Sequence, residues 1–325
     1  MKISIIHDYA NQFGQCSRFH ELDGHQLCIF NTAYRDDQRV IEEAGDCEVL
    51  VLTQQRVPIN RAILEKLPQL KLICQTGRNV NHIDITACSD HGVFVSAGQI
   101  THAESPYSTT AELTWGLNIA SLRQIPYEVE RFKAGHWHST VGSRLSGQTL
   151  GIYAFGHIGS AVARVGKAFG MNVVCWGREG SLSRAKAEGF ALAKSRESFF
   201  SSADIVSLHL PGNQHTQGII TAADLALMKT TSLLVNTGRA PIIEKGALVT
   251  ALKLGRPGFA AIDVFEEEPV LGATHPLLHL PNALCTPHLG YAETQSYEAM
   301  YTSAIDRILA YAQGRPTGII NPKAS

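Results

Sequence analysis

The segment Leu150-Gly-Ile-Tyr-Ala-Phe-Gly-His-Ile-Gly159 is the clearest indication of the fold in this sequence. An apolar run typical of a strand leads into a turn that contains glycine, and the Ala- and Val-rich pattern of residues 160–169 that follows is typical of a helix. In a βαβ unit with this order, the turn lets the backbone approach a pyrophosphate at the helix N-terminus. The segment therefore predicts a dinucleotide-binding unit.

The turn departs in one place from the pattern G-x-G-x-x-G. Ala154 stands at the first glycine position, and Gly156 and Gly159 hold the other two. If this position has a positive φ, alanine costs about 1 kcal/mol more than glycine there; if φ is negative, the methyl group only crowds the turn. Under both alternatives we expect Ala154, Gly156, His157, Ile158 and Gly159 to contact the cofactor.

Length, composition and charge exclude several classes of protein. A chain of 325 residues is long enough for two domains. Hydrophobic residues make up 44% and charged residues 18%, which is typical of a soluble globular protein. Because the formal net charge is −1 and no apolar run could span a bilayer, we expect neither nucleic acid nor a membrane as a partner.

The cysteines and histidines bear on location and metal binding. Seven cysteines are scattered without any Cys-x-x-Cys pair, which favours a reducing, cytoplasmic setting. The N-terminal run Met1-Lys-Ile-Ser-Ile-Ile6 is too short for a signal peptide, and we interpret it as a first strand. None of the 14 histidines stands in a His-Glu-x-x-His spacing, so we expect no metal site.

Short apolar runs alternate with helical patterns along almost the whole chain, which predicts an α/β fold with parallel sheets. The predicted strands are 2–6, 49–52, 72–74, 93–95, 149–154, 172–176, 205–208, 233–236, 258–262 and 283–286, and the clearest helices between them are 60–67, 160–169, 222–228 and 245–254.

Two further apolar-periodic helices, 103–123 and 294–312, flank the second series of strands. The dinucleotide unit therefore lies in the middle of the chain. We expect an outer, substrate domain made of residues 1–102 and 293–325, and a dinucleotide-binding domain made of residues 103–292.

The end of the second strand of the βαβ unit bears on the choice of cofactor. This strand usually ends in Asp or Glu, which binds the adenosine ribose, but Gly177 occupies that position here and Arg178 follows. The absence of a carboxylate at this position and the presence of a fixed cation beside it both favour NADP. In the alternative interpretation, Arg178 is a solvated loop residue paired with Glu179, and NAD binds through other groups.

Polar residues follow later strands at three points where open α/β sheets place their sites. The segments are Val235-Asn-Thr-Gly-Arg239-Ala-Pro-Ile-Ile-Glu244, Ala261-Ile-Asp263-Val-Phe-Glu-Glu-Glu268-Pro269 and Cys285-Thr-Pro287-His288-Leu-Gly290.

Residues 49–294, which include these three segments, resemble the D-isomer-specific 2-hydroxyacid dehydrogenases, the group that includes D-3-phosphoglycerate dehydrogenase and glyoxylate/hydroxypyruvate reductase. Further motifs at family spacing are Gly135-x-Trp137, Gly147-x-Thr-Leu-Gly151, Gly156-His-Ile-Gly159, Leu208-His-Leu-Pro211 and Met228-Lys229. The resemblance implies two Rossmann-like domains, the outer one flavodoxin-like and discontinuous, with the active site between them. It also implies a homodimer formed through the cofactor domains.

The resemblance further implies a catalytic trio, which falls on Arg239, Glu268 and His288. A guanidinium can fork onto the carboxylate and carbonyl of a 2-oxo acid, and an imidazole can give and take the proton. A carboxylate beside the ring favours its charged form and fixes it. Alternatively, His288 is a loop histidine satisfied by backbone, Glu268 belongs to a solvated acidic run, and Arg239 caps its loop.

The resemblance also implies where cofactor and substrate bind. Besides the glycine turn, the expected cofactor contacts are Gly177, Arg178, Leu210, Pro211, Thr237, Gly238, Asp263 and Gly290, with Asp263 on the nicotinamide side. The glycine-containing loop Gln75-Thr-Gly77-Arg78-Asn-Val-Asn-His-Ile-Asp84 is expected to meet the substrate carboxylate. Gly77, Arg78 and Arg56 are the candidate substrate-binding residues, although Arg78 as a plain surface residue is an open alternative.

These observations predict an NAD(P)-dependent oxidoreductase that transfers hydride between nicotinamide and a small 2-oxo or D-2-hydroxy acid, with NADP favoured. A second hypothesis is an NAD(H)-sensing, protein-binding relative without significant turnover, which the trio does not exclude because such corepressors keep it. A formate- or phosphite-oxidising relative is disfavoured, since formate enzymes carry Gln where Glu268 stands.

Overall fold

The computed structural model describes residues 1–98 and 109–321. It divides into two compact units, which are Met1–Glu104 with Glu293–Ser325 (unit 1) and Ser105–Ala292 (unit 2). The expected domain boundary after residue 102, the start of the expected helix 103–123 and the last residues of the expected segment 293–325 lie outside the described residues.

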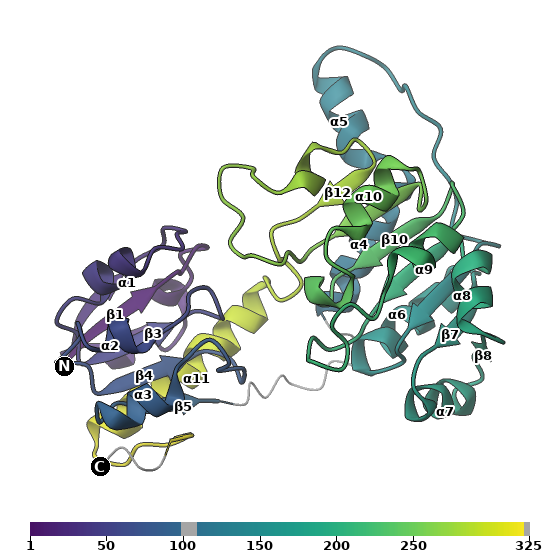
Figure 1. Ribbon diagram of the computed structural model, residues 1–325. Coiled ribbons are helices and arrows are strands. Elements are labelled where there is room, and N and C mark those ends of the chain that lie inside the picture. The colour runs from purple at the N-terminus through teal and green to yellow at the C-terminus, as the bar shows by residue number, and fades with distance from the viewer. Residues whose placement is uncertain (99–108, 322–325) are drawn as a thin grey trace. The chain divides into compact units, whose positions relative to one another are not determined.

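Unit 1 contains a five-stranded, fully parallel sheet (Figure 1). Its strand order is β2-β1-β3-β4-β5, the order of flavodoxin-like sheets. The strands are β1 (Lys2–Ile6), β2 (Gln26–Ile29), β3 (Val49–Leu52), β4 (Leu72–Gln75) and β5 (Phe94–Ala97). The three strands β1, β3 and β4 are apolar along almost their whole length because helices bury both of their faces.

Helices α1 (Asp37–Ala44), α2 (Arg61–Leu64) and α3 (Ile85–Asp90) contribute to one apolar core of unit 1. The side chain of the residue before each of them accepts a hydrogen bond from a backbone N–H of the first turn. The long helix α11 (Thr294–Ala312) packs on the sheet from outside this core, where the Cys74 thiol contacts the carbonyl of Ala304. Short 3₁₀ helices follow β1 at Phe13–Gln15 and Phe19–Leu22.

Unit 2 contains a seven-stranded parallel sheet in the order β12-β11-β10-β9-β6-β7-β8. The strands are β6 (Thr149–Tyr153), β7 (Asn172–Trp176), β8 (Ala191–Leu192), β9 (Ile205–Leu208), β10 (Leu233–Asn236), β11 (Phe259–Ile262) and β12 (Ala283–Cys285). From β6 the chain first builds the sheet toward β8 and then returns to build it toward β12. The order therefore reverses between β6 and β9, and ligands of open α/β sheets bind at the carboxyl ends beside such a reversal.

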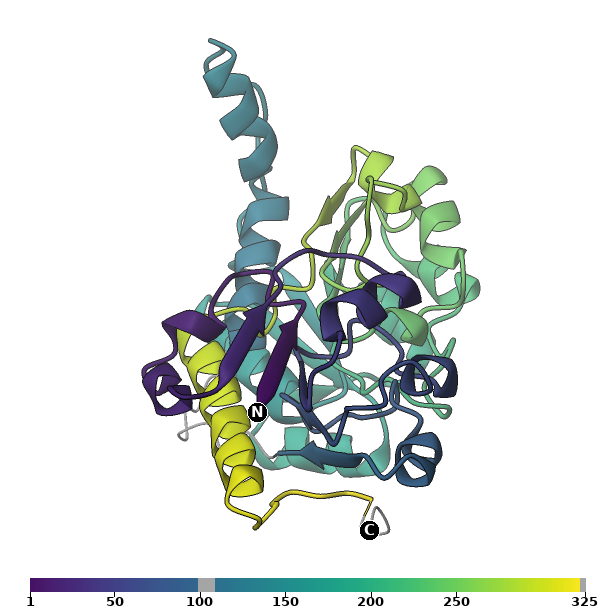
Figure 2. The same cartoon turned by 90° about the vertical axis from the view of Figure 1, so that its left-hand side faces the viewer.

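Helices cover both faces of this sheet. One apolar core includes residues of α4 (Thr109–Leu122), α6 (His157–Ala168) and α7 (Glu179–Ala187). The other includes residues of α8 (Arg196–Ser202), α9 (Ala222–Leu227) and α10 (Ala247–Lys253). Helix α5 (Ile125–Lys133) has no buried residue. It extends away from the sheet, as Figures 1 and 2 show. Short 3₁₀ helices lie at Ala240–Ile242 and Pro276–His279.

The prediction of an α/β fold with two parallel sheets is confirmed. All predicted strands are present and differ from the observed ones only at their ends, whereas strands β2 and β8 were not predicted and helices α1, α3, α5, α7 and α8 were not among those named. Because β2 was not predicted, β3, whose following loop contains Arg56, is the third strand of its unit, whereas we expected Arg56 in the loop after the second strand. Within the part of the chain that the structure describes, no helix is long and apolar enough to cross a bilayer. The same residues hold no cluster of His, Cys, Asp and Glu that could bind a metal ion.

Candidate active site

Arg239, Glu268 and His288 follow three neighbouring strands of unit 2. They come after β10, β11 and β12 respectively, and these strands pair in parallel register. Because carboxyl ends of parallel strands share one edge of a sheet, the fold brings the loops of all three residues to that edge.

His288 and Glu268 are in direct contact. The Nδ1 atom of His288 lies 2.5 Å from Oε2 of Glu268, and the two side chains are 23% and 19% exposed. The other carboxylate oxygen of Glu268 accepts a hydrogen bond from the backbone N–H of Phe265 at 2.9 Å. Since the carboxylate accepts a hydrogen bond from Nδ1 of the ring, the other ring nitrogen, Nε2, is available to exchange a proton with a ligand.

The neighbouring acids have different surroundings. Glu266 pairs with Nε2 of His275 at 3.0 Å, and Glu267 is exposed. Within the described residues, the acidic run is thus not uniformly solvated, and its last member is the one that contacts His288.

A buried carboxylate fixes the segment that carries His288. Asp263 is 0% exposed and accepts hydrogen bonds from Thr286 Oγ1 (2.6 Å) and from the backbone N–H groups of Leu289 (2.7 Å) and Gly290 (2.9 Å). Burial raises the pKa of the Asp263 carboxyl above its ordinary value. His288 itself has φ +54°, a strained conformation that persists only where the surroundings enforce it. In this structure Asp263 therefore holds the segment around His288 in place.

The loop of Arg239 is held by a buried amide. Asn236 is 1% exposed; its Nδ2 donates to the carbonyl of Arg239 (3.1 Å) and its Oδ1 accepts from the N–H of Gly238 (3.0 Å). The guanidinium is exposed and donates to the carbonyl of Gly238 at 2.7 Å. A Cβ at Gly212 would lie only 2.8 Å from Cγ of Arg239, so this glycine leaves room for the arginine side chain.

Threonines at the start of α4 join the loops after β10 and β12. The hydroxyls of Thr114 and Thr237 lie 2.8 Å apart. Thr109 and Thr110 donate to the carbonyl of Gly290 at 3.0 and 2.8 Å. The sequence interpretation predicted Thr237 but missed Thr109, Thr110 and Thr114 of α4, and also Asn236 and Gly212. Of these missed residues only Asn236 lay inside a quoted motif, and the three threonines of α4 carried no local signal.

The glycine turn fits a bound pyrophosphate. Gly156 is the N-cap of α6, and a Cβ built on it meets no atom within 4 Å, so the N–H groups of the first helical turn are approachable. At Gly159 a Cβ would collide with the carbonyl oxygen of Ala154, which explains the third glycine. Ala154 has φ +75°, so the alternative with a positive φ holds, in which alanine is strained relative to glycine.

The backbone at the end of β7 explains why Gly177 stands where a Rossmann unit usually has Asp or Glu. Gly177 has φ +155°, and a Cβ there would lie 3.2 Å from Oγ of Ser181 and 3.4 Å from Cα of Ala154. Aspartate at this position would thus be strained. Arg178 is the exposed N-cap of α7, and within the described residues it forms no ion pair with Glu179. Leu210 (buried) and Pro211 (exposed) follow β9, which pairs with β6 beside the turn.

The three candidate substrate-binding residues belong to unit 1. Gly77 and Arg78 follow β4, and Arg56 follows β3, so all three lie at the carboxyl edge of their sheet. Gly77 is buried and Arg78 is exposed. The guanidinium carbon of Arg56 lies 5.4 Å from the ring centroid of Tyr9, and this arginine is 9% exposed.

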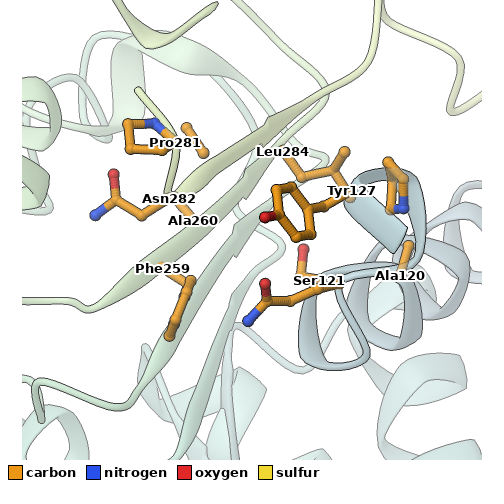
Figure 3. Close-up of a pocket in the computed structure, with 11 residues that line it drawn as sticks. Ala120, Ser121, Tyr127, Phe259, Ala260, Pro281, Asn282 and Leu284 are labelled. Atoms are coloured by element: carbon orange, nitrogen blue, oxygen red, sulfur yellow. The ribbon is translucent and has the colours of Figure 1, made fainter. Parts of the chain in front are cut away.

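A cavity of about 310 Å³ lies elsewhere in unit 2 (Figure 3). It is lined by residues around the first positions of β11 and β12, by the end of α4 and by the start of α5: Ala120, Ser121, Gln124, Pro126, Tyr127, Phe259, Ala260, Pro281, Asn282, Ala283 and Leu284. The amino ends of β11 and β12 contribute to this cavity, whereas Glu268 and His288 follow their carboxyl ends. The cavity is therefore distinct from the candidate active site.

Comparison with known proteins gives one consistent family. Residues 115–290 match the family model of the D-isomer specific 2-hydroxyacid dehydrogenase, NAD binding domain. A glyoxylate reductase of Aeropyrum pernix is 37% identical over 80% of this chain and 78% of its own length. A D-3-phosphoglycerate dehydrogenase of Methanocaldococcus jannaschii is 34% identical over 85% of this chain but only 52% of its own length. The crystal structure of a phosphoglycerate oxidoreductase from Vibrio cholerae O395 is 42% identical and covers 97% of this chain and 99% of its own, with a TM-score of 0.89. The chain therefore belongs to the D-isomer-specific 2-hydroxyacid dehydrogenase family, whose members bind NAD and catalyse oxidoreduction by hydride transfer.

Proposed function

We propose that this protein reduces a small 2-oxo acid to the D-2-hydroxy acid with a nicotinamide cofactor, and catalyses the reverse oxidation. The observation that carries the proposal is the 2.5 Å contact between His288 and Glu268 at the sheet edge that Arg239 shares. The names of the relatives from Aeropyrum pernix and Methanocaldococcus jannaschii support a 2-oxo acid substrate.

Arg239 binds the substrate in this proposal. Its guanidinium is exposed at the edge, and its donors match the adjacent carboxylate and carbonyl of a 2-oxo acid. Hydrogen bonds from a cation to the carbonyl oxygen stabilise the negative charge that develops there as the carbon is reduced. Gly77, Arg78 and Arg56 of unit 1 are assigned to the rest of the substrate.

His288 moves the proton. Its Nε2 gives a proton to the carbonyl oxygen during reduction and takes it from the hydroxyl during oxidation. Glu268 fixes the orientation of the ring through its contact with Nδ1, so it acts through His288 and is a positioning residue. Asp263 keeps the segment in place through its three hydrogen bonds.

The cofactor supplies or accepts the hydride when it is bound. The open N-terminus of α6 would hold the pyrophosphate, as the fit of Gly156 and Gly159 supports. We assign the remaining cofactor contacts to the residues at the same edge: Ala154, His157, Ile158, Gly177, Arg178, Leu210, Pro211, Thr237, Gly238, Asp263 and Gly290.

The cytoplasmic location of the protein stays a prediction from the cysteine pattern.

The experiment that tests this function is a screen of the purified protein. Oxidation of NADH and of NADPH is followed with glyoxylate, hydroxypyruvate, pyruvate, 2-oxoglutarate and 3-phosphohydroxypyruvate. Turnover of at least one of these acids, with chiral analysis giving the D product, is expected. Cofactor binding without turnover of any 2-oxo acid would contradict the proposal and favour an NAD(H)-sensing protein.

We further propose a preference for NADPH. Gly177 has no carboxylate to repel a 2′-phosphate, and Arg178 offers a guanidinium at the N-terminus of α7, where anions are stabilised. Changing Arg178→Ala should lower kcat/KM for NADPH roughly tenfold or more, since a charge-assisted hydrogen bond is lost. The value for NADH should stay the same.

The matched control for this change is Lys186→Ala. Lys186 is another exposed cation on α7, but it stands in the last turn of the helix. The variant Lys186→Ala should leave kcat/KM for NADPH and for NADH unchanged. A wild-type protein that prefers NADH would overturn the proposed preference.

We propose that unit 2 forms a homodimer. Helix α5 and the segment after it expose Tyr127 (51%), Phe132 (64%), Trp137 (77%) and Val141 (94%), an unusual concentration of apolar surface. Tyr127 lies beside Leu284 at the cavity of Figure 3. Because α5 extends beyond the sheet, a second copy of this chain could cover these side chains.

The double change Phe132→Ser and Trp137→Ser should convert a dimer into a monomer, as sedimentation velocity would measure. These two rings pack edge to face, with centroids 5.9 Å apart. The control is Leu254→Ser, which removes an equally exposed (79%) apolar side chain at the end of α10 and should leave the dimer intact. A monomeric wild-type protein at micromolar concentration would contradict the proposal.

A further inference from the structure

His288 has a second neighbour besides Glu268, the aromatic side chain of Tyr291, to which the proposed function gives no role. The centroids of the two rings lie 5.7 Å apart, and the ring planes meet at 77°. At this distance and angle an edge of one ring faces the plane of the other, which is a favoured arrangement of aromatic pairs. Tyr291 is half-buried and belongs to unit 2, as His288 does, so the contact lies within one compact unit.

The contact with Glu268 alone does not fix the imidazole of His288. The carboxylate meets the ring at one corner, Nδ1. Coupled changes of the two side-chain torsions can keep this contact and still displace Nε2, the atom that exchanges the proton. His288 also has the strained φ of +54°, and relaxation of this strain would move the ring as well. A second contact on the ring opposes both movements.

The backbone that carries Tyr291 is held from two directions. The N–H groups of Leu289 and Gly290 donate to the buried carboxylate of Asp263 at 2.7 and 2.9 Å. The carbonyl of Gly290, in the peptide bond that leads to Tyr291, accepts from the hydroxyls of two threonines of α4 at 3.0 and 2.8 Å. The N–H of Ala292 closes the turn by donating to the carbonyl of Leu289 at 2.8 Å. Because this turn is already ordered, little backbone entropy is lost in holding the phenol ring against the imidazole.

We propose that Tyr291 is a positioning residue for proton transfer: its ring packs against the imidazole of His288 and, together with Glu268, fixes Nε2 where the substrate oxygen exchanges its proton. The inference rests on the proposed function and adds to it a residue outside the trio. Packing requires the ring and not the phenol hydroxyl, so phenylalanine should replace tyrosine without loss. Displacement of a reacting group by about 1 Å can cost about 10²-fold in rate, so loss of the ring should lower kcat.

The test compares the wild type with Tyr291→Leu and Tyr291→Phe in the reduction of the best substrate of the screen. Tyr291→Leu should lower kcat roughly tenfold, a part of the cost of a fully misplaced group. The KM for the 2-oxo acid and the dissociation constant of the reduced cofactor should change by less than about twofold, since a step after binding is affected. Tyr291→Phe should keep the wild-type kcat. The solvent isotope effect on kcat, measured in D₂O, should be larger in Tyr291→Leu than in the wild type, because a misplaced acid slows the proton step.

A double variant shows whether Tyr291 acts through His288. Tyr291→Leu should lower kcat in the wild type but not in a protein that already carries His288→Asn, because residues that act together have non-additive effects. The matched control is Phe169→Leu. Phe169 also forms an aromatic pair, with its ring centroid 5.0 Å from that of Trp115, but it follows α6 at the end away from the glycine turn. Phe169→Leu should leave kcat and the isotope effect unchanged.

The contact itself can be measured by NMR without turnover. The ring current of a tyrosine shifts the proton resonances of a neighbouring ring. The imidazole resonances of His288, identified by their absence in His288→Asn, should therefore move in Tyr291→Leu and stay in place in Phe169→Leu. If the leucine variant does not fold, Tyr291→Met replaces it in every measurement, since methionine is apolar and adaptable but has no ring.

Three kinetic outcomes would overturn the inference and leave the proposed function intact. A wild-type kcat in Tyr291→Leu would do so, as would a rise in KM without a fall in kcat, which would make Tyr291 a contact of the substrate. An equal loss in Tyr291→Phe would assign the effect to the hydroxyl, and a full effect of Tyr291→Leu beside His288→Asn would show that the ring does not act through His288. A wild type that turns over no 2-oxo acid would instead contradict the proposed function, while the imidazole resonances would still decide whether the contact exists.

Discussion

Replacing His288 by asparagine should lower kcat for 2-oxo acid reduction by roughly 10²–10⁴-fold, the range by which a positioned acid or base accelerates proton transfer. Asparagine has a similar shape and can donate to Glu268 in place of Nδ1, so the carboxylate keeps a partner. It cannot, however, supply a proton to the carbonyl oxygen. Binding of the reduced cofactor, measured by its fluorescence, should be almost unchanged, because the glycine turn is untouched.

His275→Asn provides the matched control. His275 also contacts a carboxylate of the same acidic run, with Nε2 of the ring 3.0 Å from Glu266. If the effect at His288 came only from the loss of a histidine–glutamate pair, both variants should lose activity equally. Near-normal turnover in His288→Asn would remove the acid/base assignment.

Replacing Arg239 by glutamine should lower kcat/KM by roughly 10²–10³-fold, the effect of losing one donor that stabilises a developing oxyanion. Arg239→Lys should recover only part of the loss, because an ammonium keeps the charge but lacks the planar fork. Both variants should show a raised KM as well as a lowered kcat, since the guanidinium contacts the substrate before and during reduction. Steady-state kinetics with the best substrate of the screen measure both constants.

Lys253→Gln is the control for charge. It removes an exposed positive charge from the last turn of α10, in the same unit as Arg239. Its kinetics should match those of the wild type. If Arg239→Gln kept its kcat and only its KM rose, Arg239 would bind substrate without polarising the carbonyl.

The sequence predicted the buried strands well but missed one edge strand of each sheet. The strands β1, β3 and β10 are apolar almost throughout because both faces are covered, and this pattern is visible in the sequence. Strands β2 and β8 lie at sheet edges and are partly or fully exposed, so they carry little apolar signal. Helix α5 was missed for the same reason, since it has no buried residue.

Within the candidate site, the sequence identified chemical groups better than the contacts that hold them. Arg239, Glu268 and His288 lie in recognisable motifs. The hydrogen bonds from Thr109 and Thr110 to Gly290 join segments far apart in the chain, so only the folded structure pairs them. The backbone angle of Ala154 likewise could not be read from the residue type, because alanine adopts both signs of φ at different cost.

The split composition of unit 1 has a consequence for synthesis on the ribosome. Its five strands are translated first, yet the helix that covers one side of them, α11, comes only after the whole of unit 2. Tyr301 of that helix is completely buried and donates to Asp8, near the beginning of the chain. Because domains tend to fold as units while they emerge, the nascent chain can complete unit 2 while one face of the earlier sheet is still bare. The first part to be made is therefore the last to be finished.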